Sequence, residues 1–230
     1  MSRRRVVVTG LGALAPNGND LDSFWDALVN GRSGIGPITK FDASEHRAQI
    51  AGEIKGFDAE AVLDRKDVRR NDPFTHYAIY VANQATEHGG LDMEAVDAER
   101  VGVIWGSGIG GIQTHEEQHT ILMDKGPKRV SPFYVPMMIS DMAAGMISMV
   151  LGAKGPNYAT VSACSSAAHA LGEAARKIQY AEADVMVAGG SEAACTPISV
   201  AGFASAKALS TRNDEPERAS RPFDAERDGF

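Results

Sequence analysis

The amino-acid sequence predicts an α/β protein built on a largely parallel sheet. Short apolar runs of strand length alternate along the chain with longer segments in which apolar residues recur at helical spacing. Glycine follows several of the apolar runs, as it does in tight turns that lead from a strand into a helix. Chains with this alternation place helices on both faces of a mostly parallel sheet.

Four segments are expected to form strands. Each is a short apolar run that ends at, or just before, a glycine or a serine: residues 5–10, 101–105, 158–162 and 184–188. The first contains three consecutive valines, Val6, Val7 and Val8, and β-branched residues favour a buried strand.

Helices are expected where apolar residues recur every three or four positions. One helix is predicted to be capped by Asp22 and to stop at Gly31. Another is predicted to begin at Asp72-Pro73, because proline suits the first turn of a helix. The other predicted helices cover residues 112–124, 137–151, 165–180 and 198–206, with residues 32–60 and 125–136 irregular.

Composition and charge exclude several classes of protein. The chain is 43% hydrophobic and 23% charged, which is typical of a soluble globular protein. Its net charge of -7 provides no overall positive field for nucleic-acid phosphates. The most apolar window, residues 135–151, is too short and too polar to span a bilayer, and the N-terminus lacks the apolar stretch of a secretory signal. Two cysteines exclude a disulfide framework and are expected to be reduced thiols in a cytoplasmic protein.

Cys164 is the strongest candidate for a chemical role. It lies between a predicted strand and a predicted helix, and the positive end of a helix favours the reactive thiolate. A sharp turn from strand to helix would also push its side chain outward. The alternative is a cysteine that only fills space in the core, and the residues alone leave both interpretations open. Cys195 has no comparable helix start and is expected to be structural.

Residues 115–119, His-Glu-Glu-Gln-His, match the H-E-x-x-H pattern of zinc proteases. On a helix the two histidines would share one face. No third ligand can be identified downstream, and the neighbouring residues are polar and suit a solvated surface. We therefore expect no metal site here.

Two glycine-rich segments, residues 10–15 and 106–111, match the G-x-G-x-x-G/A pattern of dinucleotide-binding loops. Pro16 would break the helix that must follow the first loop. The second lacks an acidic residue at the end of a following strand. Tight turns between strands and helices are the expected role of both, and an NAD(P)-binding oxidoreductase remains as an alternative.

The segment around Cys164 resembles the nucleophile segment of the β-ketoacyl-acyl-carrier-protein synthases. The likeness is carried by residues 161–169, Val-Ser-Ala-Cys-Ser-Ser-Ala-Ala-His. Other segments resemble further signatures of that family: residues 6–12, 184–192, 202–210 and 221–230. The resemblance extends over essentially the whole chain.

This resemblance implies a thiolase-like fold of two similar βαβαβαββ halves, of which residues 1–230 would form the N-terminal half. The C-terminal half, with two histidines and a lysine of the active site, would lie outside this chain, so residues 1–230 alone are expected to be inactive. The implied enzyme is a homodimeric acyltransferase of fatty-acid elongation that uses neither a cofactor nor a metal ion. Its cysteine takes an acyl chain from acyl carrier protein, and decarboxylation of malonyl carrier protein drives a Claisen condensation with that thioester.

The resemblance also implies individual roles. Cys164 would be the nucleophile, with its own N–H in the oxyanion hole, and Ile109 and Phe203 would line the acyl pocket. Six basic residues would receive the acidic carrier protein: Lys66, Arg69, Arg70, Lys128, Arg129 and Lys207. A polyketide-type ketosynthase and a non-catalytic carrier-binding fragment remain as alternative functions.

Overall fold

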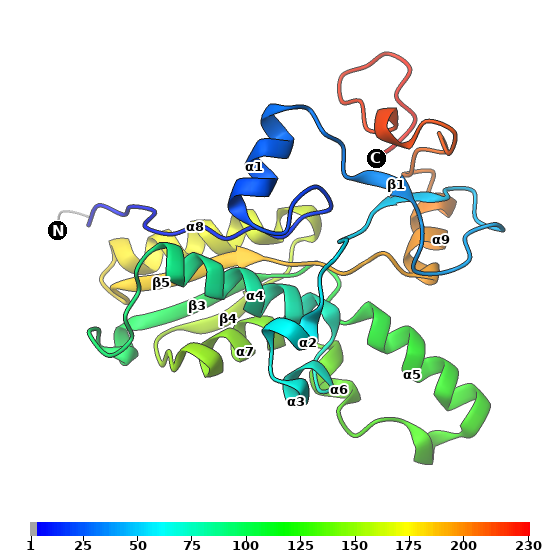
Figure 1. Ribbon diagram of the computed structural model, residues 1–230. Helices are drawn as coiled ribbons and strands as arrows, with labels where there is room; N and C mark the ends of the chain where they lie inside the picture. The colour runs from blue at the N-terminus through cyan, green and yellow to red at the C-terminus, as the bar shows by residue number, and fades with distance from the viewer. Residues whose placement is uncertain (1–3) are drawn as a thin grey trace. The chain divides into compact units, whose positions relative to one another are not determined.

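The computed structural model describes residues 4–230, which fall into two compact units (Figure 1). The first unit combines the chain up to Gly12 with Asp58–Ala193, and the second combines Ala13–Phe57 with Ala194–Phe230. Each unit is therefore assembled from two separate stretches of the sequence.

A three-stranded parallel sheet forms the centre of the first unit. Its strands are β3 (Val101–Gly106), β4 (Asn157–Thr160) and β5 (Val185–Gly190), in the order β4-β3-β5. In the register of the sheet, Trp105 lies between Ala159 and Gly189. Every residue of β3 is buried, as expected for a central strand covered on both faces. The strands predicted over residues 101–105, 158–162 and 184–188 are confirmed, with shifted ends.

Helices cover both faces of this sheet, as the alternating pattern predicted (Figure 1). Helices α4 (Pro73–His88) and α7 (Met142–Leu151) pack on one face, where Val103 and Trp105 join their core. Helix α8 (Ser166–Gln179) packs on the other face against Ile104, through Ala170 and Ala174. Alternate residues of β3 thus point to opposite cores, as the pleat of a strand requires.

Buried Asp72 fixes the start of α4. Its carboxylate accepts the Phe74 N–H at 3.2 Å, and the N–H and hydroxyl of Thr114 at 2.9 and 2.8 Å. Burial raises the pKa of Asp72 above its ordinary value, and the bonds from Thr114 oppose that shift. Thr114 belongs to α5 (Ile112–Lys125), so the residue that caps α4 also joins α4 to α5.

Shorter elements complete the first unit: α2 (Ala59–Val62), α3 (Arg65–Val68), α6 (Tyr134–Met138), and the 3₁₀ turns η1 (Ala98–Arg100), η2 (Pro127–Arg129) and η3 (Ala163–Ser165). The continuous helix predicted over residues 137–151 is wrong, because α6 ends at Met138 and Ile139 is extended. The Met138 carbonyl instead accepts the Gly111 N–H at 3.0 Å, so a contact from another segment interrupts the helix.

The strand predicted over residues 5–10 is also wrong. This segment has no regular secondary structure, and Val7 and Val8 are 60% and 79% exposed. Valines favour a strand only when a neighbouring strand supplies hydrogen bonds and packing, and none of the strands within residues 4–230 pairs with this segment.

The second unit contains α1 (Leu21–Val29), the antiparallel strands β1 (Ile35–Pro37) and β2 (Ile50–Gly52), α9 (Pro197–Ser205) and the turn η4 (Pro216–Arg218). Asp20 caps α1 through a reciprocal pair of bonds with Ser23, so the predicted cap, Asp22, is wrong. The β1–β2 pair lies inside residues 32–60, which were predicted to be irregular.

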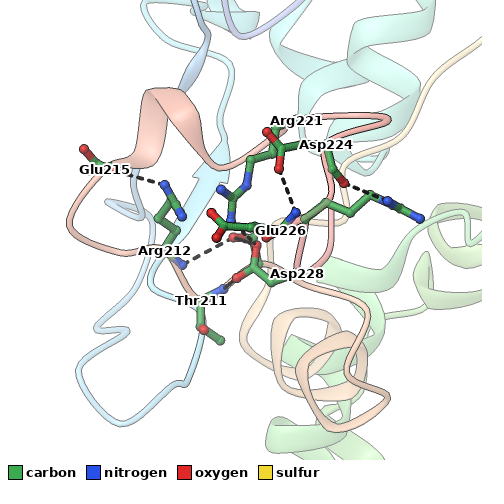
Figure 2. A network of polar contacts seen from close by, with 9 residues as sticks. Thr211, Arg212, Glu215, Arg221, Asp224, Glu226 and Asp228 are labelled. Atoms are coloured by element: carbon green, nitrogen blue, oxygen red, sulfur yellow. Dashed lines mark hydrogen bonds and ion pairs between the residues drawn. The ribbon is translucent and has the colours of Figure 1, made fainter.

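The last segment of the chain folds back on itself in a network of polar contacts around Asp228 (Figure 2). The Asp228 carboxylate accepts the Ser210 hydroxyl at 2.8 Å and the Thr211 N–H at 3.1 Å, and it pairs with Arg221 at 3.6 Å. These hydrogen bonds, that from Ser210 first, lower the pKa of Asp228. Residues 221–230 are thereby held without a helix or strand. No helix within residues 4–230 is long and apolar enough to cross a membrane.

Candidate active site

Cys164 lies at a sharp turn between a parallel strand and a helix, as the sequence indicated. Strand β4 ends at Thr160, η3 carries Cys164, and α8 begins at Ser166. The preceding residue, Ala163, has φ +52°, in the left-handed region that residues other than glycine seldom adopt. The Cys164 side chain is exposed and is a free thiol. The turn therefore presents the sulfur outward at the carboxyl end of the sheet.

Hydrogen bonds hold this turn in its strained conformation. The Ser162 N–H donates to the Ser166 hydroxyl at 2.9 Å, and that hydroxyl donates to the Ala163 carbonyl at 2.7 Å. The Ser162 hydroxyl lies 2.6 Å from Nδ1 of His169, on the next turn of α8. A strained backbone persists only where its surroundings determine it in this way, so His169 supports the turn that carries Cys164.

Glycines at the ends of two strands allow α8 to approach the sheet. An added Cβ on Gly106 would lie 2.4 Å from the carbonyl carbon of Ser166. An added Cβ on Gly190 would lie 2.6 Å from Cβ of Ala167. No larger residue fits at either position without movement of the helix, so these glycines set the place of the turn beside the carboxyl ends of β3 and β5.

The glycine-rich loop after β3 binds a carboxylate of the protein itself. Glu192, which follows β5, accepts the Ser107 hydroxyl at 3.0 Å and the N–H groups of Gly108 and Ile109 at 2.7 and 3.4 Å. In dinucleotide-binding folds, the corresponding N–H groups face a phosphate. Their use here by Glu192 argues against the oxidoreductase alternative.

The earlier glycine loop is likewise a packing feature. Added Cβ atoms on Gly10 and Gly12 would lie 2.0 and 2.1 Å from carbonyl oxygens of α4, those of Ala85 and Val81. These glycines allow the N-terminal segment to lie directly against that helix.

The two expected acyl-pocket residues belong to different units. Ile109 lies in the loop held by Glu192, and its side chain is 38% exposed. An added Cβ on the adjacent Gly108 would be 3.3 Å from Cα of Ala163, which places this loop against the turn of Cys164. Phe203 lies on α9 in the second unit, where its ring meets that of Phe230 edge-on at 5.5 Å.

Five of the six expected docking residues belong to the first unit, and all six are exposed: Lys66, Arg69, Arg70, Lys128, Arg129 and, in the second unit, Lys207. The guanidinium of Arg70 lies 4.8 Å from the ring centre of Phe133. This contact connects the basic cluster around α3 with the segment that follows the basic turn η2.

The remaining candidates have structural contacts. The Cys195 thiol lies 3.6 Å from the Gly52 carbonyl, and burial raises the pKa of this thiol. His115 contacts the Tyr134 hydroxyl at 2.7 Å through Nδ1, and its ring stacks with that of His119. Within residues 4–230, no group of three or more His, Cys, Asp or Glu side chains is arranged to hold a metal ion.

Comparison with known proteins identifies the family. The model of the β-ketoacyl synthase N-terminal domain matches residues 3–230. The chain belongs to the β-ketoacyl synthase family.

Curated relatives of this synthase chain carry the name 3-oxoacyl-[acyl-carrier-protein] synthase 2. The protein from Synechocystis sp. is 53% identical over 230 residues, which are 100% of this chain and 55% of that protein. The protein from Vibrio cholerae is 52% identical over 230 residues and is covered to 56%. The chain thus spans about half the length of the curated relatives that it matches.

Solved structures of synthases confirm the thiolase-like α/β fold. A β-ketoacyl synthase from Burkholderia phymatum is 31% identical with a TM-score of 0.87, covering 100% of this chain and 56% of that one. A second structure, described as a type II PKS acyl-carrier protein in complex with its ketosynthase, is 26% identical with a TM-score of 0.78. It covers 90% of this chain and 57% of that one.

Sequence reasoning did not predict two contacts around Cys164, the binding of Glu192 to the loop after β3 and the hydrogen bond between Ser162 and His169. Glu192 had one detectable signal in the sequence, since it is an acidic residue two positions beyond the end of β5, at the carboxyl edge of the sheet. No signal in the sequence indicated the hydrogen bond between Ser162 and His169, because the order of residues does not show in which direction either side chain points.

Proposed function

We propose that this chain is the N-terminal half of a β-ketoacyl-acyl-carrier-protein synthase of type II, which elongates fatty acids by decarboxylative condensation. The observation that carries the proposal is the exposed Cys164 at the strained turn between β4 and α8. Further support comes from curated relatives with 50 to 53% identity that are named 3-oxoacyl-[acyl-carrier-protein] synthase 2. The free thiols Cys164 and Cys195 are consistent with a cytoplasmic protein.

The proposed reaction has two covalent steps. The Cys164 thiolate attacks the thioester carbonyl of an acyl carrier protein, a new thioester forms, and the thiol of the carrier leaves. Malonyl carrier protein then loses carbon dioxide, and the resulting carbanion attacks the carbonyl carbon of the Cys164 thioester. A carbon–carbon bond forms, and the Cys164 thiolate leaves. The helix start at Cys164 offers backbone N–H groups to the developing oxyanion.

Acyl carrier protein is the proposed partner. The chain carries a net charge of -7, so an acidic partner needs a local positive surface, and the exposed residues around α3 and η2 provide one. The 26% identical ketosynthase has been captured with its own acyl carrier protein. The higher identity to fatty-acid relatives favours that pathway over a polyketide pathway.

Acyl transfer from two donors tests this function in the full-length protein that contains residues 1–230. Replacing both Lys128 and Arg129 by Glu is expected to raise KM for an acyl carrier protein about tenfold or more. The new carboxylates would then repel the acidic surface of the carrier. Transfer from the same acyl group on coenzyme A should be unchanged. Lys154→Glu, an exposed charge reversal between α7 and β4, is the control. Equal losses with both donors would contradict carrier docking at η2.

We further propose a homodimer. Strand β4 is an edge strand of the sheet within residues 4–230, and Val161 just beyond it is 64% exposed. Proteins usually cover such edges, and two-fold pairing of β4 with a second copy would do so. Sedimentation of the full-length protein at micromolar concentration is expected to give twice the monomer mass, and a monomer mass would overturn the proposal.

A further inference from the structure

Glu192 lies two residues beyond the end of β5. The preceding residue, Ser191, donates its N–H to the Gly106 carbonyl at 3.1 Å, and its hydroxyl donates to the Phe74 carbonyl at 2.7 Å. The indole N–H of Trp105 donates to the same Ser191 hydroxyl at 2.9 Å. Backbone and side-chain bonds thus anchor the residue next to Glu192 to the core and to β3.

The carboxylate of Glu192 reaches across to the loop after β3. It accepts three donors, the Ser107 hydroxyl and the N–H groups of Gly108 and Ile109, at 3.0, 2.7 and 3.4 Å. Ser107 is 2% exposed, and its hydroxyl also accepts the Gly110 N–H at 3.0 Å. The conformation of four consecutive residues therefore depends directly or indirectly on one carboxylate.

This loop contacts the turn of the nucleophile. An added Cβ on Gly108 would lie 3.3 Å from Cα of Ala163 and 3.0 Å from Oε2 of Glu192. Gly108 is therefore confined between the carboxylate and the residue before Cys164. Ile109 follows Gly108 directly and donates its own N–H to the same carboxylate, so this carboxylate constrains the backbone on both sides of the Gly108–Ile109 bond.

We propose that Glu192 is a positioning residue that holds the loop of Gly108 and Ile109 against the turn of Cys164 and thereby sets which acyl chains reach the sulfur. The proposal rests on the function proposed above, because it assumes an acyl chain bound beside Cys164. Glu192 acts only through the loop, so its loss should alter acyl selection more than the reactivity of the thiol.

Two variants of the full-length protein separate these effects. Glu192→Ala removes all three acceptor contacts, and Glu192→Gln keeps the shape but turns one oxygen into an NH₂ that faces donors. The ratio of Cys164 acylation rates for a long and a short acyl donor is expected to change about tenfold in Glu192→Ala and less in Glu192→Gln. The rate of Cys164 alkylation by iodoacetamide should stay within about twofold of wild type, since the turn is held by other bonds. Glu94→Ala, at an exposed position elsewhere in the first unit, is the control.

A double-mutant cycle tests whether Glu192 acts through Ile109. Ile109→Ala and Glu192→Ala are expected to be non-additive in the long-to-short ratio, because both disturb one contact surface. If the alanine variant does not fold, as judged by thermal unfolding, the glutamine variant supplies the same comparison.

The outcomes distinguish this inference from the proposed function. A wild-type protein in which Cys164 takes no acyl group would contradict the function itself. A wild-type protein that is acylated, with a long-to-short ratio unchanged in both Glu192 variants, would overturn only the role of Glu192. Additive effects of the two alanine substitutions would equally overturn an action through Ile109.

Discussion

Cys164→Ala is expected to abolish the proposed transfer of an acyl group from the carrier protein to this residue, with a loss of more than about 10³-fold. The turn around Cys164 presents the only exposed thiol within residues 4–230, because Cys195 is partly buried. The nearby Ser162 hydroxyl and His169 ring are hydrogen-bonded to each other, so neither is free to replace the sulfur. Covalent attachment requires a nucleophile that is both exposed and ionisable near neutral pH.

Intact-mass analysis after treatment with iodoacetamide or an acyl donor measures this effect. Wild-type protein should gain one adduct on Cys164, and Cys164→Ala should gain none. Cys195→Ala is the matched control and should react like wild type, because burial raises the pKa of the Cys195 thiol and keeps it protonated at neutral pH. Acylation of Cys164→Ala at the wild-type rate would refute the role of Cys164 as the nucleophile.

Gly106→Ala is expected to lower the free energy of unfolding by about 3 kcal/mol, as overpacking against rigid backbone does. The new Cβ would lie 2.4 Å from the carbonyl carbon of Ser166 and 2.6 Å from the nitrogen of Ala167. Both atoms belong to the first turn of α8, so the helix must move away from β3. Because Cys164 lies two residues before this turn, the same substitution should also slow the proposed acylation of Cys164.

Urea denaturation compares this variant with Gly172→Ala, a matched substitution on α8 itself. An added Cβ on Gly172 meets no atom within 4 Å, so alanine there should raise the free energy of unfolding by about 0.5 to 1 kcal/mol. The opposite signs isolate the contact with the sheet from the helix propensity of alanine. Equal stability of Gly106→Ala and wild type would show that α8 is not held as closely as the structure indicates.

Local patterns determined much of the fold and indicated Cys164 as a candidate nucleophile. The start of α4 was predictable because a capping aspartate and a proline act within one turn of the helix that they begin. Strands β3 and β5 were predictable because each is a continuous apolar run followed by glycine. Cys164 was detectable for the same reason, since the change from strand to helix and the cysteine between them fall within a few residues.

Contacts between residues distant in sequence decided the parts of the fold that local patterns did not predict. Val7 and Val8 have strand-forming side chains, yet they form no strand because no neighbouring strand pairs with them within residues 4–230. A carbonyl that bonds to Gly111 separates α6 from α7, although the residues between them are compatible with a helix. Neither outcome can be read from the segment concerned, because the deciding hydrogen-bond partner is distant in sequence.

The sequence by itself determined the strand–turn–helix unit that carries Cys164, together with the parallel strands and the helices that flank them. Only the tertiary structure decided which residues surround that cysteine. Glu192 reaches Gly108 across 84 residues of sequence, and Gly106 lies against Ser166 in a different element. Secondary structure depends on neighbours along the chain and can be recognised from their pattern. The geometry around the sulfur depends on residues that become neighbours only when the sheet and its helices have packed together.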